Sequence, residues 1–168
     1  MNMAIRGIDA NLGSYHADTF FNDLHKTLKA DFIMANPPFN LSNWGADKLK
    51  ADVRWKYGTP PSGNANYAWI LHILNKLNVS RGIAGFLLAN GALDDSDTLE
   101  IRKLLIESDK VEAIIVLPRN MFYSTDISVT LWILNNNKKG GPWHGRQLRN
   151  RTGEILFIDL RTWNSNIY

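Results

Sequence analysis

The chain has 168 residues, of which 45% are hydrophobic and 21% are charged, a composition typical of a single globular domain and unlike that of a disordered chain. It contains no cysteine, which excludes disulfides, thiolate metal sites and cysteine nucleophiles, and it has no apolar run near the roughly 20 residues that cross a membrane. The formal net charge of +3 suits an acidic partner such as nucleic acid, although many basic proteins bind none.

Hydrophobic patterning predicts strands that alternate with helices. Met1–Ile8 has the pattern of a helix end that stops at Gly7, so the chain is expected to begin in mid-domain. Ala30–Asn36 predicts a short buried strand, and the polar stretch Leu41–Asn66 predicts a long loop. A helix that ends near Asn78 follows, because apolar side chains recur there at helical spacing. These side chains are Tyr67, Ile70, Leu71, Leu74 and Leu77.

The second half of the chain predicts one more helix and four strands. The strands are Ile83–Asn90, Val111–Leu117, Ser128–Leu134 and Ile155–Leu160. The helix is expected to start at Asp97 and Glu100, which are spaced like a capping box. Its core face would carry Leu99, Leu104 and Leu105.

The strands Val111–Leu117 and Ser128–Leu134 are separated by about ten residues without a helical pattern, whereas a parallel pair needs a crossover of a dozen or more. This pair is therefore expected to be antiparallel. Buried parallel strands followed by a late antiparallel pair predict a three-layer α/β domain. The sequence contains no G-x-G, so neither a dinucleotide-binding fingerprint nor a P-loop is expected.

The most informative segment is the predicted strand that runs into Asn36-Pro37-Pro38-Phe39. Two prolines fix φ and remove two N–H donors, so the backbone presents carbonyls without competing donors. The side-chain oxygen of Asn36 and the carbonyl of Pro37 can then accept both hydrogens of a planar NH₂ group, which frees the nitrogen lone pair to attack an electrophilic methyl group. Phe39 offers a face on which a planar base can stack. The alternative is a proline-rigidified turn with Phe39 packed in the core.

An Asn-Pro-Pro-Phe sequence after a strand resembles motif IV of S-adenosylmethionine-dependent amino-methyltransferases, above all the adenine-N6 DNA methyltransferases. From residue 1 to about residue 160, further segments resemble the modification subunit of type I restriction–modification systems. These segments are Gly7-Ile8-Asp9, Ala17-Asp18-Thr19, Asp31–Phe39, Asn66-Tyr67-Ala68-Trp69 with His72, and Leu117-Pro118 followed by Phe122. The resemblance implies a Rossmann-like methyltransferase fold and methylation of adenine N6 in DNA.

The resemblance also implies a role for each matching residue. The target-amine site would consist of Asn36, Pro37, Pro38 and Phe39. Phe39 and Phe122 would bracket a base extruded from the duplex, with core packing as the alternative for Phe122. Asp18 would accept a hydrogen bond from the adenine amine of S-adenosylmethionine, or it would cap the turn before Phe20.

The family's glycine-rich cofactor motif, and the acidic residue that holds the cofactor ribose, would precede residue 1. The chain is therefore expected to be a fragment of a methyltransferase domain, begun at an internal methionine, with most of the cofactor site upstream and no activity on its own. Residues 1–30 would hold a helix end and the third-strand region, and residues 31–168 the part from motif IV onward. The implied partners are double-stranded DNA, a specificity subunit and a restriction subunit, in a prokaryotic cytoplasm.

Three other possibilities follow from the same residues. Loss of the first strands would expose an edge of the strand Ala30–Asn36, through which the chain could pair with a second copy or exchange residues 1–30. Methyltransferases with the same motif also act on protein glutamine amides. A catalytically dead α/β module that binds a partner is the non-enzymatic alternative.

Several polar and aromatic residues allow two interpretations. Basic side chains that would either contact DNA phosphates or belong to a solvated loop are Lys138, Lys139, Arg146, Arg149 and Arg151. Asp94, Asp95 and Asp97 are better explained by helix capping than by a cation, so no metal site is expected. Trp44, Trp55 and Tyr57 would either approach substrate or fold over the core.

Overall fold

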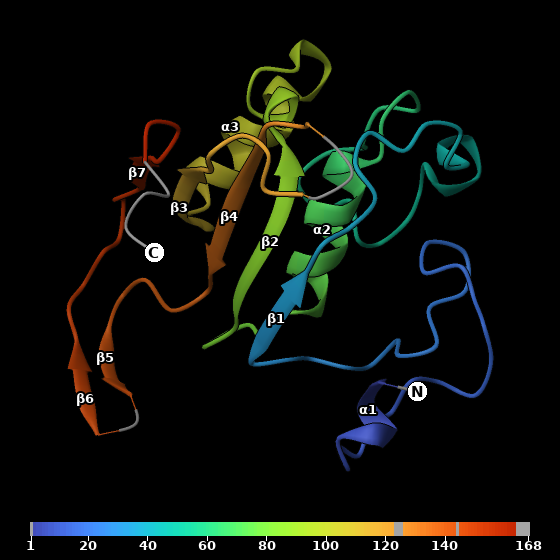
Figure 1. Cartoon of the computed structure of the whole chain (residues 1–168), viewed down its shortest axis with the longest axis horizontal. Helices are drawn as coiled ribbons and strands as arrows, with labels where there is room; N and C mark the ends of the chain where they lie inside the picture. The colour runs from blue at the N-terminus through green and yellow to red at the C-terminus, as the bar shows by residue number, and fades with distance from the viewer. Residues whose placement is uncertain (1, 123–125, 144, 164–168) are drawn as a thin grey trace.

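Five strands form one mixed sheet in the computed structural model, which describes residues 2–122, 126–143 and 145–163 (Figure 1). The order across the sheet is β1 (Phe32–Ala35), β2 (Ile83–Ala89), β4 (Val129–Asn135), β3 (Val111–Val116) and β7 (Leu156–Asp159). The remaining elements are α1 (Asn2–Ile5), α2 (Asn66–Lys76), α3 (Leu99–Glu107), the 3₁₀ turns η1 (Ala46–Leu49), η2 (Asn90–Leu93) and η3 (Ser96–Thr98), and a hairpin of β5 (Gly141–Trp143) and β6 (Arg146–Leu148).

The predicted antiparallel pair is confirmed, because β4 runs antiparallel to both β3 and β2. Strand β1 is parallel to β2, and β3 is parallel to β7. Strands β1, β2 and β3 therefore all end at the same edge of the sheet. The loops that follow these three strands meet at this edge, which is where open α/β sheets bind their ligands.

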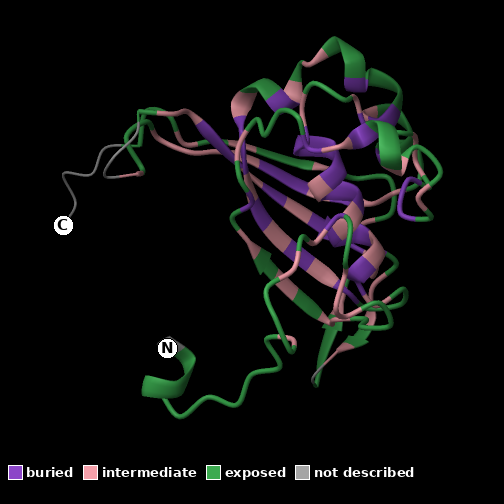
Figure 2. Cartoon of the chain, turned by 90° about the vertical axis from the view of Figure 1, so that its right-hand side faces the viewer, coloured by how far each residue is buried: buried purple, intermediate pink, exposed green. Residues whose placement is uncertain are grey.

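Helices α2 and α3 cover the same face of the sheet. Tyr67 of α2 packs edge-on against Trp132 of β4, with ring centroids 6.3 Å apart, and Leu105 of α3 lines a small cavity that Trp132 also lines. Figure 2 shows the buried residues gathered between this face and the helices. On the other face, side chains such as Leu87 and Leu131 are only partly buried. The described residues thus supply two layers of the expected three-layer α/β domain.

Strand β1 is present as expected, but it is not buried. Its side chains alternate between exposed and half-buried, and Phe32 and Met34 are 62% and 93% exposed. The physical reason is its place at the edge of the sheet, where one face packs on α2 and the other face carries no described helix. Within residues 2–30, α1 and turns precede β1, and the expected third-strand region makes only one bridge, between Ala30 and Leu77.

The apolar face of α3 differs from the prediction. Ile101 and Leu105 are buried, whereas Leu99 and Leu104 are 56% and 40% exposed. The expected capping box is also absent, because the cap bond is made two residues earlier, at the start of η3, where Asp95 Oδ1 accepts from the Asp97 N–H at 3.0 Å. The 3₁₀ turn η3 precedes the helix, which begins at Leu99, and the buried side of this stretch consists of Thr98, Ile101 and Leu105.

The long loop between β1 and α2 is held by its tryptophans. Trp44 and Trp55 are buried against Phe20, and their indole N–H groups donate to the carbonyls of Pro61 and Leu49. Of the two interpretations for these side chains, the structure confirms the core role. In the described ranges the longest helix has 11 residues, and none has the length and apolar character of a membrane span.

The burial of α3 predicts unequal effects for two neighbouring leucines. Leu105→Ala should lower the free energy of unfolding by about 2–5 kcal/mol, since it removes a fully buried side chain and leaves a cavity. Leu104→Ala, the matched control, should change it by less than about 1 kcal/mol. Urea unfolding followed by tryptophan fluorescence measures both. Equal losses for the two variants would contradict the observed helix face.

Candidate active site

The Asn36-Pro37-Pro38-Phe39 segment leaves the sheet at the carboxyl end of β1. Residue pairing with β2 ends at Ala35, and the two prolines that follow have no N–H with which to continue the ladder. Pro37 is buried, whereas the Asn36 side chain is exposed and available to a substrate. The segment therefore combines a fixed backbone with an accessible carboxamide.

The structure brings Phe39 and Phe122 together. Their ring centroids lie 5.8 Å apart at an interplanar angle of 61°, and both side chains are partly buried. Phe122 comes from the loop after β3, whose carboxyl end shares the sheet edge with β1. Two rings that sandwich a planar base need to lie parallel and about 7 Å apart, twice the base-stacking distance. The observed tilted pair leaves no such gap between its two rings.

A cavity of about 350 Å³ borders the motif on the side of α2. Asn36 and Pro37 line it together with Thr19, Trp69 and His72. Through Thr19, the turn that contains Asp18 therefore borders the same cavity as Asn36 and Pro37. The indole N–H of Trp69 is buried and has no hydrogen-bond partner among the described residues.

Asp18 lies in a turn that precedes Phe20. Its Oδ1 accepts hydrogen bonds from the N–H groups of Phe20 and Phe21, at 2.8 and 3.3 Å, and the side chain is exposed. These bonds are the capping contacts that one of the two interpretations expected. Both bonds use the same carboxylate oxygen, Oδ1. The cofactor role that the other interpretation expects for Asp18 stays a prediction.

Arg54 fixes this turn, a role that sequence patterning did not indicate. The guanidinium group is buried, pairs with Asp52 at 2.7 Å, and donates to the carbonyls of Thr19 and Phe20. It also lies 3.1 Å from Nδ1 of His72 on α2. A loop arginine thereby joins three segments that are far apart in the sequence. In the sequence, Arg54 is an arginine beside Trp55 in a polar stretch. Such an arginine is too common to indicate a structural role.

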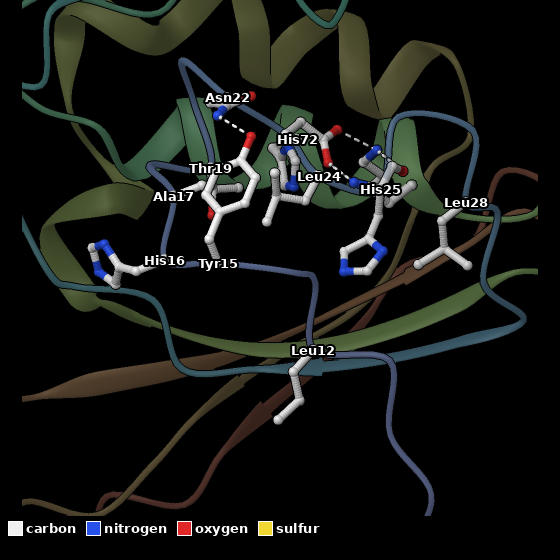
Figure 3. A pocket seen from close by; sticks show the side chains of 12 residues that line it. Leu12, Tyr15, His16, Ala17, Thr19, Asn22, Leu24, His25, Leu28 and His72 are labelled. Atoms are coloured by element: carbon white, nitrogen blue, oxygen red, sulfur yellow. Dashed lines mark hydrogen bonds and ion pairs between the residues drawn. The ribbon is translucent and has the colours of Figure 1, made fainter.

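A second cavity, of about 420 Å³, lies between residues 12–28 and α2 (Figure 3). Asn22 donates to the Tyr15 hydroxyl at 3.1 Å at its rim, and Lys76 forms an ion pair with Asp23. Burial of Lys76 is thus compensated by a carboxylate and by the His25 carbonyl, to which its ammonium donates. No group of three metal-ligating side chains occurs in the part of the chain that the structure describes.

The basic segment after β4, Lys138–Arg151, contains the β5–β6 hairpin, which packs near the residue at which β1 begins. Trp143 contacts Phe32, the first residue of β1, at 5.7 Å between ring centroids. At about 3.3 Å per residue, Asn36 lies about 13 Å further along the chain. Figure 1 shows the hairpin projecting beyond this end of the sheet.

Three of the five basic side chains in this segment are held by carboxylates. Lys138 is buried, pairs with Asp109 at 2.7 Å and donates to two backbone carbonyls, so it is not available to a phosphate. Arg149 makes a bidentate pair with Glu154, and Arg151 pairs with Glu112. Lys139 and Arg146 are exposed.

Comparison with known proteins places the chain in a family. The family model described as N-6 DNA Methylase matches residues 1–167. The chain is 47% identical over 163 residues to the type I restriction enzyme HindI methylase subunit of Haemophilus influenzae, covering 96% of this chain and 34% of that subunit. It is 40% identical to the MjaIX methylase subunit of Methanocaldococcus jannaschii, covering 96% of this chain and 28% of the relative.

The fold is also similar to a solved structure of this class of protein. The structure of a type I restriction–modification methyltransferase subunit from Streptococcus thermophilus superimposes with a TM-score of 0.79 at 26% identity, covering 96% of this chain and 33% of that one. The chain therefore spans about a third of the length of these relatives.

The partly buried side chain of His72 predicts an acid-sensitive fold. Burial, aided by the nearby Arg54, lowers the pKa of His72 to about 4, from about 6.5 in an unfolded chain. Between these values the unfolded chain binds a proton that the folded chain does not. The free energy of unfolding should therefore fall by at most about 3 kcal/mol as the pH drops from about 6.5 to about 4.

Denaturant titrations at several pH values measure this effect. His72→Gln should flatten the pH dependence within this window, and His16→Gln, which removes an exposed histidine, should leave it unchanged. Asp23 and Asp52 also have lowered pKa values, but their contribution is lost only below the ordinary range near 3.8. If the pH dependence of the free energy of unfolding is unaltered in His72→Gln, a group other than His72 causes it.

Proposed function

Because the chain belongs to the N-6 DNA methylase family, we propose that it forms part of the catalytic domain of a type I restriction–modification methylase subunit, which methylates adenine N6 in DNA. The observation that carries the proposal is the Asn36-Pro37-Pro38-Phe39 segment at the carboxyl end of β1, with Phe122 against Phe39. This arrangement provides hydrogen-bond acceptors and an aromatic platform at one edge of the sheet. Both are what a flipped adenine requires.

In the proposed reaction the chain holds and activates the target amine. The Asn36 side-chain oxygen and the Pro37 carbonyl accept its two hydrogens, so the nitrogen lone pair is directed at the methyl donor. The new N–C bond forms as the methyl–sulfur bond of the donor breaks, and the amine then loses one proton. No covalent bond to the protein is needed, because positioning lowers most of the barrier.

The base would enter between Phe39 and Phe122. Because the two rings contact each other at 5.8 Å and 61°, one of them must move before a base can stack on the other. Unstacking and unpairing of the target adenine cost a few kcal/mol. Stacking on Phe39, worth about 1–3 kcal/mol, offsets part of that cost.

S-adenosylmethionine would supply the electrophilic methyl group. The residues present fit part of such a site, because the Asp18 turn and Asn36 border one cavity and the Trp69 indole N–H there is unpartnered among the described residues. We propose that Asp18 accepts a hydrogen bond from the cofactor's adenine amine. Most of the cofactor site would be contributed by residues outside this chain.

The proposed partners are double-stranded DNA, a specificity subunit and a restriction subunit. For DNA phosphates, the basic side chains that support the proposal are the exposed Lys139 and Arg146. Arg149 and Arg151 would have to exchange a carboxylate for a phosphate. Since the hairpin packs near the end of β1 away from Asn36, such contacts would lie apart from the target base.

Two other functions give different results in the same assay. A methyltransferase for protein glutamine amides would leave DNA unmethylated and would label a protein substrate. A catalytically dead partner-binding module would label neither. The 47% identity to a type I methylase subunit favours DNA.

Asn36→Ala tests the proposed role of the carboxamide. In the intact methylase subunit, assembled with its specificity subunit, the rate of adenine methylation should fall by at least about 100-fold, since an acceptor aimed at the reacting amine is lost. Binding of S-adenosylmethionine, measured by calorimetry, should not change. Ser42→Ala, an exposed residue in the loop that follows, is the control. A wild-type rate in Asn36→Ala would refute this role.

The exposed edge of β1 leads us to propose that this chain self-associates. Strand β1 pairs with β2 on one side, and its Phe32 and Met34 side chains are largely exposed. Light scattering should show a mass that rises with concentration, through strand pairing or exchange of residues 1–30. Met34→Lys should weaken the association, whereas Val53→Lys, an equally exposed loop position, should not. A monomer at all concentrations would refute the proposal.

A further inference from the structure

The segment that follows Phe39 is tied to the first turn of α2 by three asparagines. Nδ2 of Asn66 donates to Oδ1 of Asn40 at 2.9 Å, and Oδ1 of Asn66 accepts from the Asn40 N–H at 3.0 Å. These two bonds form a reciprocal pair between the Asn66 side chain and Asn40, which lies four positions after Asn36 in the sequence. Asn66 is 3% exposed, so breaking the pair would leave a buried carboxamide unsatisfied.

Asn64 completes the arrangement, which we call the asparagine clasp (Asn40, Asn64 and Asn66). Its Oδ1 accepts from the Asn66 N–H at 2.8 Å, and its Nδ2 donates to Oδ1 of Asn40 at 3.2 Å. One more bond, from the Ala65 N–H to the Leu41 carbonyl at 2.9 Å, continues the contact. Asn40 itself has a φ of 52°, a conformation that asparagine adopts more readily than most residues.

The clasp fixes one end of the target-amine segment, and the sheet fixes the other. Ala35 is paired with Phe86 in β2, and Asn40 is held by Asn66, so only four residues lie between the two anchors. Two of these four are prolines with restricted φ. The direction of Phe39 and of the Asn36 carboxamide is therefore set by both anchors together.

The start of α2 is itself a rigid reference point. Tyr67, next to Asn66, is fully buried and its hydroxyl donates to the Ala92 carbonyl in η2 at 2.7 Å. Strand β2 leads directly into η2, so the helix start and the sheet edge are linked. A displacement of Asn66 would accordingly be transmitted to Asn40 and Phe39 rather than absorbed by the helix.

We propose that Asn66 is a positioning residue for methyl transfer, which acts through Asn40 and does not touch the substrate. This inference rests on the proposed function, and it adds a residue to which no catalytic role has been given above. The clasp holds the amine acceptors and Phe39 in the geometry that the reaction needs. Loss of the clasp leaves the core intact but misplaces these groups, and a misplacement of about 1 Å can cost about 100-fold in rate.

The hydrogen-bond directions make the same chemical change act differently at the two ends of the clasp. Asn40→Asp keeps an oxygen that accepts from Asn66 and Asn64, so the clasp survives. Asn66→Asp replaces the donor with a carboxylate oxygen that faces Oδ1 of Asn40, so the clasp is broken by repulsion. Asn66→Ala removes both bonds without adding charge.

Amide hydrogen exchange in this chain tests the clasp independently of activity. In Asn66→Ala the Asn40 amide should exchange at least about tenfold faster, equivalent to a bond worth about 1.4 kcal/mol. The amide of Phe86 in β2 should keep its protection, as should the Asn40 amide in Asn40→Asp. Unchanged exchange at Asn40, or a matching loss of protection at Phe86, would overturn the positioning role.

Steady-state methylation by the intact subunit with its specificity subunit tests the consequence. Asn66→Asp should lower kcat by about 100-fold with an unchanged KM for DNA and unchanged cofactor affinity, whereas Asn40→Asp should keep the wild-type kcat. Wild-type kcat in Asn66→Asp, or equal losses in both variants, would overturn the proposal. If the unmodified subunit methylates no adenine, the proposed function fails, and the exchange measurement still decides whether the clasp holds the segment.

Discussion

The end of strand β1 is the constraint on which the candidate site depends. Pro37 and Pro38 have no N–H to donate to a ladder, and the residue pairing of β1 with β2 ends at Ala35. An edge strand can end in this way without disturbing its neighbours, because β2 is paired along its full length with β4 on the other side. The position of β1 at the edge thus makes room for a backbone that would be too costly inside the sheet.

Topology then decides what meets this segment. Phe122 is far from Phe39 in the sequence, and it reaches Phe39 because β3 is parallel to β1 although β4 lies between them in antiparallel orientation. The same antiparallel insertion carries the basic hairpin after β4 toward the opposite end of the sheet. One reversal of strand direction therefore separates the aromatic pair from the positive charges.

The sequence predicted the elements better than their environments. The strands and α2 follow from apolar periodicity, and the antiparallel pair follows from a connection too short for a crossover. The burial of β1 was predicted wrongly, and so was the placement of Leu99 and Leu104 on the core face of α3. Periodicity reports which residues are apolar, but it does not report whether a second layer covers a strand or which apolar residues of a helix pack on the sheet.

The contacts that hold the site were beyond the reach of the sequence for a further reason. Arg54 and Asn66 are polar residues in or beside a polar loop, and nothing in their neighbours distinguishes a buried residue from a solvated one. Each is saturated by partners that become adjacent only after the chain folds, such as the Thr19 carbonyl for Arg54 and Asn40 for Asn66. The residues from Asn36 to Phe39, by contrast, are consecutive, so their motif can be recognised from the sequence alone.

Different interactions stabilise the core and fix the shape of the candidate site. The core around Trp132 and Leu105 is apolar, and its free energy is spread over many contacts, each of them small. The loops that carry the Asp18 turn and the Asn36–Phe39 segment are held instead by a few directional bonds to buried polar groups, each costly to leave unmade. A domain built in this way can keep its fold when one such bond is lost while the site loses its shape.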